Sequence, residues 1–326
     1  MINLVYNEMV KLFGKKRLLA ILLIIAVLIP LFTFAQYKTA KTIEERLGST
    51  DWKASLQQQI IDSQNRLTSS RLSDEWRKVI QVRLAQQQYY LDHDVNPAAP
   101  GAPTFIRVFL ENSISLMLPL FVMVISADLV SSEYSGGTIK ILLTRPVQRW
   151  KVLLSKYIVM LLSISLILLA IVTMAYLISG LVFGYGGWNL PLLTGFVTEG
   201  EDLNTSLVHM IPQWQYILMD LGLVWFVCVV VGTMSFMLSV LIKSTATGMG
   251  VMLAALITGA ILRSMVSSWE SAKYFFMVNL ELTEYLSGMP PPINGMSLSF
   301  SLTVLFIWGL MGFIITFWVF TRRDVY

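Results

Sequence analysis

Residues 131–146 have the sequence SSEYSGGTIKILLTRP, a polar, basic and glycine-containing segment. Long apolar runs flank it on both sides, at residues 109–130 and 157–183. A soluble domain has no obvious use for a short charged segment set between two such runs. Each run is instead long enough to cross the hydrocarbon core of a bilayer, which needs roughly 20 apolar residues. The segment is therefore predicted to connect two membrane-spanning helices.

The composition of the whole chain supports a membrane protein. Of its 326 residues, 55% are hydrophobic and only 13% are charged, and its mean hydropathy is +0.66. Soluble domains carry about 25% charged residues. A membrane β-barrel would show short segments of alternating hydrophobicity, and this pattern does not occur in the sequence. We therefore expect an all-α, polytopic membrane protein.

Hydropathy predicts about six membrane-spanning helices. They are residues 18–37, 109–130, 157–183, 216–241, 247–265 and 299–320. The segments before, between and after them are chiefly residues 1–17, 38–108, 131–156, 184–215, 266–298 and 321–326. Residues 1–17 have an apolar face, which favours an interfacial helix leading into a retained first span over a secretory signal peptide.

Lys and Arg residues near the span ends predict the orientation, because cytoplasmic loops carry an excess of positive charge. The basic residues that fall on one side are Lys11, Lys15, Lys16, Arg17, Lys140, Arg145, Arg149, Lys151, Lys156, Lys243, Arg322 and Arg323. On the other side, residues 184–215 contain no Lys or Arg. Both termini are therefore expected in the cytoplasm, and the expected location is a cell membrane, with a bacterial plasma membrane as the first candidate.

Two segments on the outer side have recognisable character. Residues 38–108 show helical periodicity over residues 56–91, followed by a proline- and alanine-rich linker. A solvated helical pair that caps the membrane domain is expected there, in preference to a ligand site. Residues 266–298 are apolar and aromatic and contain three consecutive prolines, which break helices. A short re-entrant or interfacial helical hairpin is expected in this second segment.

Within residues 131–156, a glycine pair permits a sharp change of direction. Thr138 then begins a short apolar and basic helix, which Pro146 ends. This helix is expected to lie along the inner membrane face, where Lys140 and Arg145 would meet anionic lipid or an acidic protein surface. The alternative is an ordinary cytoplasmic loop with a positive charge bias.

Three segments of the chain resemble the permeases of ABC-2 type transporters, which are membrane subunits of ATP-binding-cassette exporters. The most specific pattern consists of Glu133, Gly136, Gly137, Thr138, Ile139, Leu142, Leu143, Pro146, Arg149 and Lys156. EMVKLF at residues 8–13 is similar to the N-terminal elbow helix of these permeases, and FTRRDVY at residues 320–326 is similar to their C-terminal tail. With the six expected spans, the resemblance covers the whole chain. Residues 38–108 are longer than in the simplest members, which leaves the substrate class open.

The resemblance implies a permease subunit that exports its substrate with the energy of ATP hydrolysed by a separate ATPase. A coupling helix would dock on that ATPase, and the coupling residues would be Glu133, Gly136, Gly137, Thr138, Ile139, Lys140, Leu142, Leu143, Arg145 and Pro146. The chain has no Gly-x-x-x-x-Gly-Lys-Ser/Thr loop, so ATP and Mg are expected on the ATPase and no cofactor on this chain. Two ATPase copies, a second identical or related permease, and membrane lipid are the expected partners, and nucleic acid is not.

Small residues in the fourth and fifth spans predict close helix contacts. A pathway or dimer contact is one interpretation, and tight packing within one subunit is the other, for Gly232, Thr233, Ser235, Ala246, Gly250, Ala254 and Thr258. Ionisable residues are few: Arg107 and Glu111 are one turn apart and can pair, and Asp220 lies near the outer end of the fourth span. This scarcity argues against an ion relay. It favours an apolar or amphipathic substrate, such as a peptide antibiotic, a drug or a lipid-like molecule.

Two other function classes are alternatives to export. An intramembrane enzyme needs His-Glu-x-x-His, Ser/His or paired Asp groups at membrane depth, whereas His93 and His209 lie outside the spans. No catalytic residue and no metal site are therefore expected. The one cysteine, Cys228, lies in an apolar run and permits no internal disulfide. The alternative function is a membrane sensor or resistance scaffold that signals through the partner ATPase without true transport.

Overall fold

The computed structural model of the chain describes residues 1–47, 51–68, 72, 74–138, 147–199, 202–265, 269–293 and 295–322. Within these residues, six helices are long and apolar enough to cross a membrane. They are Arg17–Ile43, Met117–Ser135, Arg149–Phe183, Gln213–Ile242, Thr245–Arg263 and Leu298–Arg322. The expected all-α polytopic membrane fold is confirmed, with a few short strands added to it.

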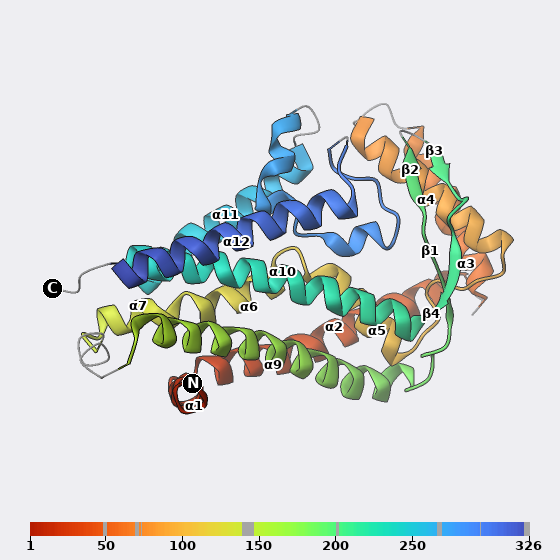
Figure 1. The fold of residues 1–326 in the computed structure, drawn as a ribbon. Helices are drawn as coiled ribbons and strands as arrows, with labels where there is room; N and C mark the ends of the chain where they lie inside the picture. The colour runs from red at the N-terminus through yellow and green to blue at the C-terminus, as the bar shows by residue number, and fades with distance from the viewer. Residues whose placement is uncertain are drawn as a thin grey trace.

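The molecule is a bundle of long helices with a small cap at one end (Figure 1). The helices of the bundle are α1 (Ile2–Gly14), α2 (Arg17–Leu47), α5 (Ala102–Ser113), α6 (Met117–Ser126), α7 (Asp128–Ser135), α9 (Arg149–Phe183), α10 (Gln213–Ile242), α11 (Thr245–Met265) and α12 (Leu298–Arg322). The end with α1, α7 and the last turn of α12 is the termini end. The opposite end, the cap end, carries the helical pair α3 (Trp52–Leu67) and α4 (Asp74–Asp92).

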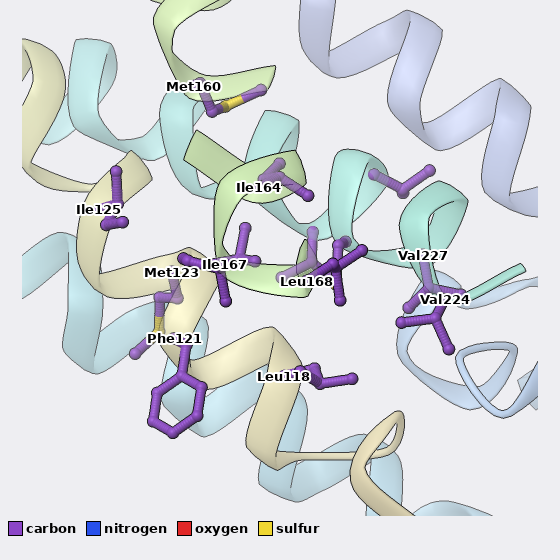
Figure 2. Close-up of a cluster of buried hydrophobic side chains, with 14 of the residues drawn as sticks. Leu118, Phe121, Met123, Ile125, Met160, Ile164, Ile167, Leu168, Val224 and Val227 are labelled. Carbon is purple, nitrogen blue, oxygen red and sulfur yellow. The ribbon is translucent and has the colours of Figure 1, made fainter. Parts of the chain in front are cut away.

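Helix α10 is the centre of the bundle and packs against α5, α6, α7, α9, α11 and α12. Apolar side chains from α6, α9 and α10 meet in the core shown in Figure 2, where Leu118, Ile164 and Val227 are almost fully buried. Of the most apolar stretch of each helix, 61% is buried in α10 but only 22% in α11 and in α12. The exposed apolar faces of α11 and α12 therefore suit lipid or another subunit.

The second predicted span, residues 109–130, is not one continuous helix. Helix α5 ends at Ser113, α6 begins at Met117, and α7 follows after Ala127. Pro119 accounts for the first interruption, because it has no N–H to donate to the carbonyl of Ser115, four residues earlier. The span that the structure offers is consequently Met117–Ser135, displaced along the chain from the predicted one.

The connection at residues 184–215 contains strands that the sequence analysis did not predict. Strand β1 (Pro191–Thr194) pairs antiparallel with β4 (His209–Pro212), and β2 (Val197–Glu199) pairs antiparallel with β3 (Asp202–Asn204). Each strand has only three or four residues, so hydrophobic alternation along the chain carries little signal. The strands lie beside α3 and α4 in the cap (Figure 1).

The described residues of the segment at 266–298, which are 269–293 and 295–298, form three 3₁₀ turns in place of the expected helical hairpin. They are η1 (Glu270–Tyr274), η2 (Phe276–Val278) and η3 (Leu282–Tyr285). Asn279 Nδ2 donates to the carbonyl oxygens of Lys273 and Phe275, each at 2.8 Å. Such side-chain bonds to the backbone compete with a regular helix, which explains the tight turns.

Candidate functional site

A cluster of ionised side chains at the termini end joins three helices that are far apart in sequence. Lys156 of α9 lies between two acids, with its Nζ 2.6 Å from Glu8 Oε2 of α1 and 2.9 Å from Glu133 Oε1 of α7. Its Nζ also donates to the Leu129 carbonyl oxygen at 3.0 Å. Lys11 Nζ lies 2.7 Å from Glu8 and 3.1 Å from Glu133. Glu8, Lys11, Glu133 and Lys156 are called the elbow cluster below.

The elbow cluster is buried and balanced in charge. The Lys156 side chain is 1% exposed, and its Nζ donates to Glu8 Oε2 and the Leu129 carbonyl oxygen and forms an ion pair with Glu133. Burial alone would raise the pKa of Glu8, but the charges of Lys156 and Lys11 outweigh it and hold the pKa below its usual value. Two acids therefore face two bases, and the cluster fixes α1 and α9 to α7.

A second ionic contact ties the start of α2 to the first turn of α7. Asp128 is 3% exposed, with Oδ2 3.0 Å from Lys15 Nζ and Oδ1 2.9 Å from Arg17 Nη1. Lys15 also donates to Ser132 Oγ at 2.6 Å. A carboxylate in the first turn of a helix is stabilised by the helix dipole, so Asp128 suits this position.

The interruption between α6 and α7 is closed by a side chain of α10. Ser239 Oγ donates to the Ala127 carbonyl oxygen and accepts from the Ser131 N–H, both at 2.8 Å. Ser131 Oγ in turn lies 2.7 Å from Thr245 Oγ1 of α11. Backbone groups at membrane depth need such partners because no water is present to replace them. Helix α7 is thus fixed to α10 and α11 as well as to α1, α2 and α9.

The first part of the predicted coupling segment lies at the end of α7. Gly136 follows the helix, and Gly137 has φ +68°, a conformation that glycine adopts at low cost. The Thr138 hydroxyl lies 3.5 Å from the Glu133 carbonyl oxygen. The other predicted coupling residues fall outside the described residues: Ile139, Lys140, Leu142, Leu143, Arg145 and Pro146. The described chain resumes at Val147, and α9 begins at Arg149.

Comparison with known proteins assigns the chain to a family. Residues 79–326 match the family described as "Protein of unknown function (DUF2705)". The chain belongs to this family. The match begins within α4, so in this DUF2705 member Glu133 and Lys156 lie inside the matched region, and Glu8 and Lys11 lie before it.

Two proteins of Bacillus subtilis (strain 168) are similar to this DUF2705 chain. It is 27% identical to "Uncharacterized protein YhcI" over 327 aligned residues, which cover 100% of the chain and 99% of the relative. It is 28% identical to "Uncharacterized membrane protein YdbK" over 215 residues, which cover 65% of the chain and 80% of that relative. The name of the second relative agrees with the membrane location that the six apolar helices indicate.

The small residues of the fourth span are accounted for by packing within this DUF2705 subunit. Gly232, Thr233 and Ser235 are buried. The Thr233 hydroxyl lies 3.0 Å from Tyr157 OH of α9, and Ser235 Oγ donates to a carbonyl oxygen of α6. At these three positions the structure agrees with the second interpretation, tight packing within one subunit, because the residues face α6 and α9.

The small residues of the fifth span have the opposite placement. Four residues spaced by four lie exposed along one face of α11: Ala246, Gly250, Ala254 and Thr258. On the opposite face, Gly259 is buried, and a Cβ added there would lie 2.5 Å from the Met277 carbonyl oxygen. Packing within the subunit thus uses Gly259, and the exposed face remains available to lipid or to another subunit.

The assembly of the elbow cluster is not predicted by the sequence. Glu133 and Lys156 were part of the family pattern, and Lys11 and Lys156 were counted as inside-facing charges. The available signal was Glu8, an acid that shares the buried face of α1 with Leu12, one turn further on. Nothing in local spacing shows that residues 8, 133 and 156 meet.

Proposed function

We propose that this chain is the membrane permease subunit of an ABC-2 type transporter that exports an apolar or amphipathic substrate. A separate ATPase would bind ATP and Mg and drive the movement. In this proposal the termini end faces the cytoplasm and the ATPase docks on residues 131–156. The observation that carries the proposal is the elbow cluster, which holds both ends of that segment at one buried lysine.

The geometry gives a route for mechanical coupling. The described parts of this segment are the end of α7 and the start of α9. Glu133 lies near the end of α7 and Lys156 on the second turn of α9, with Lys156 Nζ 2.9 Å from Glu133 Oε1. A displacement of the segment by the ATPase would therefore act on both helices together. Buried ion pairs at such short distances tolerate little change in geometry, so α1 would move with them.

Helix α10 would receive the same displacement. Ser239 holds the backbone of α7 where α6 and α7 meet, and α10 contacts most helices of the bundle. Within this proposal, the exposed small-residue face of α11 provides the contact to a second permease copy or a related permease. The substrate pathway would then lie between the two subunits.

A membrane sensor or resistance scaffold is the second candidate, because it would use the same coupling segment without a pathway. The discriminating quantity is ATP-dependent accumulation of substrate in inverted vesicles that contain the chain and its ATPase. Transport supports the permease, whereas ligand-stimulated ATP hydrolysis without transport supports the sensor.

The first test is affinity purification of the full chain from native membranes in mild detergent. We expect an ATPase with a phosphate-binding loop to co-purify, and we expect Lys140→Glu combined with Arg145→Glu to reduce its recovery. Lys41→Glu combined with Lys38→Glu, two basic residues of α2 at the cap end, is the matched control. Recovery of the chain without an ATPase would contradict the proposal.

The second test separates docking from coupling. Glu133→Ala removes an acid from the elbow cluster but leaves residues 139–146 intact. We expect the ATPase still to co-purify with Glu133→Ala, while substrate-stimulated ATP hydrolysis and transport fall together. Transport equal to that of the unaltered protein would exclude the cluster from coupling.

A further inference from the structure

A second group of ionisable side chains lies in the contact between α5 and α10 toward the cap end. Arg107 and Glu111 come from α5, and Asp220 comes from α10. Arg107 Nη1 lies 3.3 Å from Glu111 Oε1, and its Nη2 donates to the Pro97 carbonyl oxygen at 2.9 Å. Its guanidinium also stacks over the Tyr216 ring, 5.7 Å from the ring centroid. Arg107, Glu111 and Asp220 are called the outer cluster below.

Asp220 differs from the other acids described above, because no partner for its carboxylate lies among the described residues. Its side chain is fully buried, with 0% exposure. Within the part of the chain that the structure describes, neither carboxylate oxygen has a hydrogen-bond partner. The described charges that act on it are those of Glu111 and Arg107, and the latter already contacts Glu111. If Asp220 were ionised, no group among the described residues would hydrogen-bond or pair with its carboxylate.

The outer cluster has more acids than bases. Two carboxyl groups face one guanidinium, so the cluster would carry one net negative charge if both acids were ionised. A buried, unpaired carboxylate is strongly unfavourable, and such groups become neutral instead. Glu111 is paired and 22% exposed, whereas Asp220 is unpaired and fully buried. The neutral acid is thus Asp220.

We propose that Asp220 is a proton-binding site, whose carboxyl group carries a proton at neutral pH as long as α10 packs against α5. The groups that face the site are Arg107 and Glu111 of α5 and Tyr216 of α10, with Tyr90 of α4 beside Arg107. When the two helices separate and water enters, the O–H bond breaks, the proton passes to water and a carboxylate remains. Acidic conditions on the cap side therefore favour the packed state.

This inference is independent of the transport proposal, because it concerns the protonation of one carboxyl group at rest. It concerns a single proton site and not a relay. It predicts a property that can be measured on the isolated protein, without substrate and without an ATPase.

Infrared difference spectroscopy of the full-length protein in lipid vesicles at neutral pH tests the proposal. A protonated carboxyl group has a C=O stretching band that a carboxylate lacks. We expect this band in the unaltered protein and its loss in Asp220→Asn. The matched control is Asp128→Asn, which replaces a buried aspartate paired with Lys15 and Arg17 and should leave the band unchanged.

Two further measurements keep the test decisive. Incorporation of ¹³C-labelled aspartate should shift the band in the unaltered protein, which makes the result independent of the folding of any variant. The labelled experiment is carried out in the Glu284→Gln protein, because Glu284 also titrates near neutral pH. A band that does not shift on aspartate labelling, or that disappears in Glu111→Gln and persists in Asp220→Asn, would place the proton elsewhere. Absence of the band would show Asp220 ionised. Each of these results overturns the proposal.

Discussion

The two ends of the bundle use buried charge in opposite ways. In the elbow cluster two acids face two lysines, and each of the three contacts of Lys156 is within 3.0 Å. In the outer cluster two acids face one guanidinium, and Asp220 has no hydrogen-bond partner among the described residues. Helix α10 packs against both α7 and α5, so it contacts the elements of both clusters.

The number of cations beside a buried acid decides whether the acid is ionised or neutral. Where each acid has its own cation, the group is ionised and holds helices in a fixed relation. Where an acid has none, the group can remain buried only as the neutral form, and it then responds to proton concentration. Within the two proposals, one end of the molecule transmits displacement, and the other senses whether two helices are packed together.

The largest effect is expected for Lys156→Met. The substitution leaves Glu8 and Glu133 facing each other with only Lys11 between them, and breaking a buried ion pair from one side costs about 3–5 kcal/mol. Unfolding of the purified protein in detergent, followed by circular dichroism, measures the loss. Lys41→Met is the control, because Lys41 is 60% exposed and should change the free energy of unfolding by less than about 0.5 kcal/mol.

A triple variant shows whether charge is the cause. Lys156→Met combined with Glu8→Gln and Glu133→Gln removes the unpaired carboxylates together with the lysine. We expect it to recover more than half of the stability lost in Lys156→Met, because neutral replacements of a whole buried cluster are tolerated better than a broken pair. A triple variant as unstable as the single one would show that packing of the lysine side chain, and not its charge, matters.

The second prediction contrasts the two buried aspartates. Asp128→Asn should cost about 1 kcal/mol, since the carboxylate loses pairs to Lys15 and Arg17 that are themselves partly exposed and weakened by solvent. Asp220→Asn should change stability by less than about 0.5 kcal/mol, because asparagine has nearly the shape and charge of a protonated aspartate. Thermal unfolding at neutral pH measures both variants side by side. A large loss for Asp220→Asn would mean that its carboxylate has a partner, and the comparison between the two ends would fail.

Much of the fold follows from the sequence, because each membrane helix can be recognised from its own run of apolar residues. Runs of apolar residues predicted the number of spans and, apart from the displaced second one, their approximate positions. The four-residue spacing of Arg107 and Glu111 predicted a pair that the structure confirms at 3.3 Å. The elbow cluster could not be found in this way. Lys156 meets Glu8 and Glu133 from distances of 148 and 23 positions along the chain, and no periodicity links them.

The interruption of the second span was missed for a different reason. Hydropathy averages over a window, so the few polar residues where α5 gives way to α6, such as Asn112, Ser113 and Ser115, are averaged with the apolar residues around them. Pro119 was the visible signal. The repair at the second interruption depends on Ser239 of another helix, a contact that only the packed bundle reveals.

The third prediction concerns Gly137, which lies just after α7 at the termini end. A Cβ added there would meet no heavy atom within 4 Å, but φ is +68°. Gly137→Val should therefore cost about 1–2 kcal/mol of local backbone strain without a clash, and within the transport proposal it should lower ATPase coupling while the protein still inserts. Gly137→Asn is the control, because asparagine tolerates this conformation better. Equal coupled ATP hydrolysis in the glycine, asparagine and valine proteins would dissociate this turn from coupling.

The smallest effect is expected in a third group of charges, which is only partly buried. Arg263 contacts Glu281 and Glu284, so two acids again face one guanidinium, but the Glu284 side chain is 38% exposed. Burial, followed by the charge of Glu281, raises the pKa of Glu284 from 4.5 to about 7, against the opposing charge of Arg263. The folded protein then holds this proton more tightly than the unfolded chain does.

The sign of the pH dependence follows from that difference. The contribution of Glu284 to the free energy of unfolding is greatest in acid. It falls as the pH rises between the unfolded and folded pKa values, and it is level above about pH 7. Glu284→Gln should flatten the stability curve over that interval, and the control Glu270→Gln, at an exposed position of η1, should not. Unfolding midpoints measured across the interval test this. An unchanged slope in Glu284→Gln would show that an excess of acids over bases makes a carboxyl group proton-sensitive only when, as at Asp220, solvent is fully excluded.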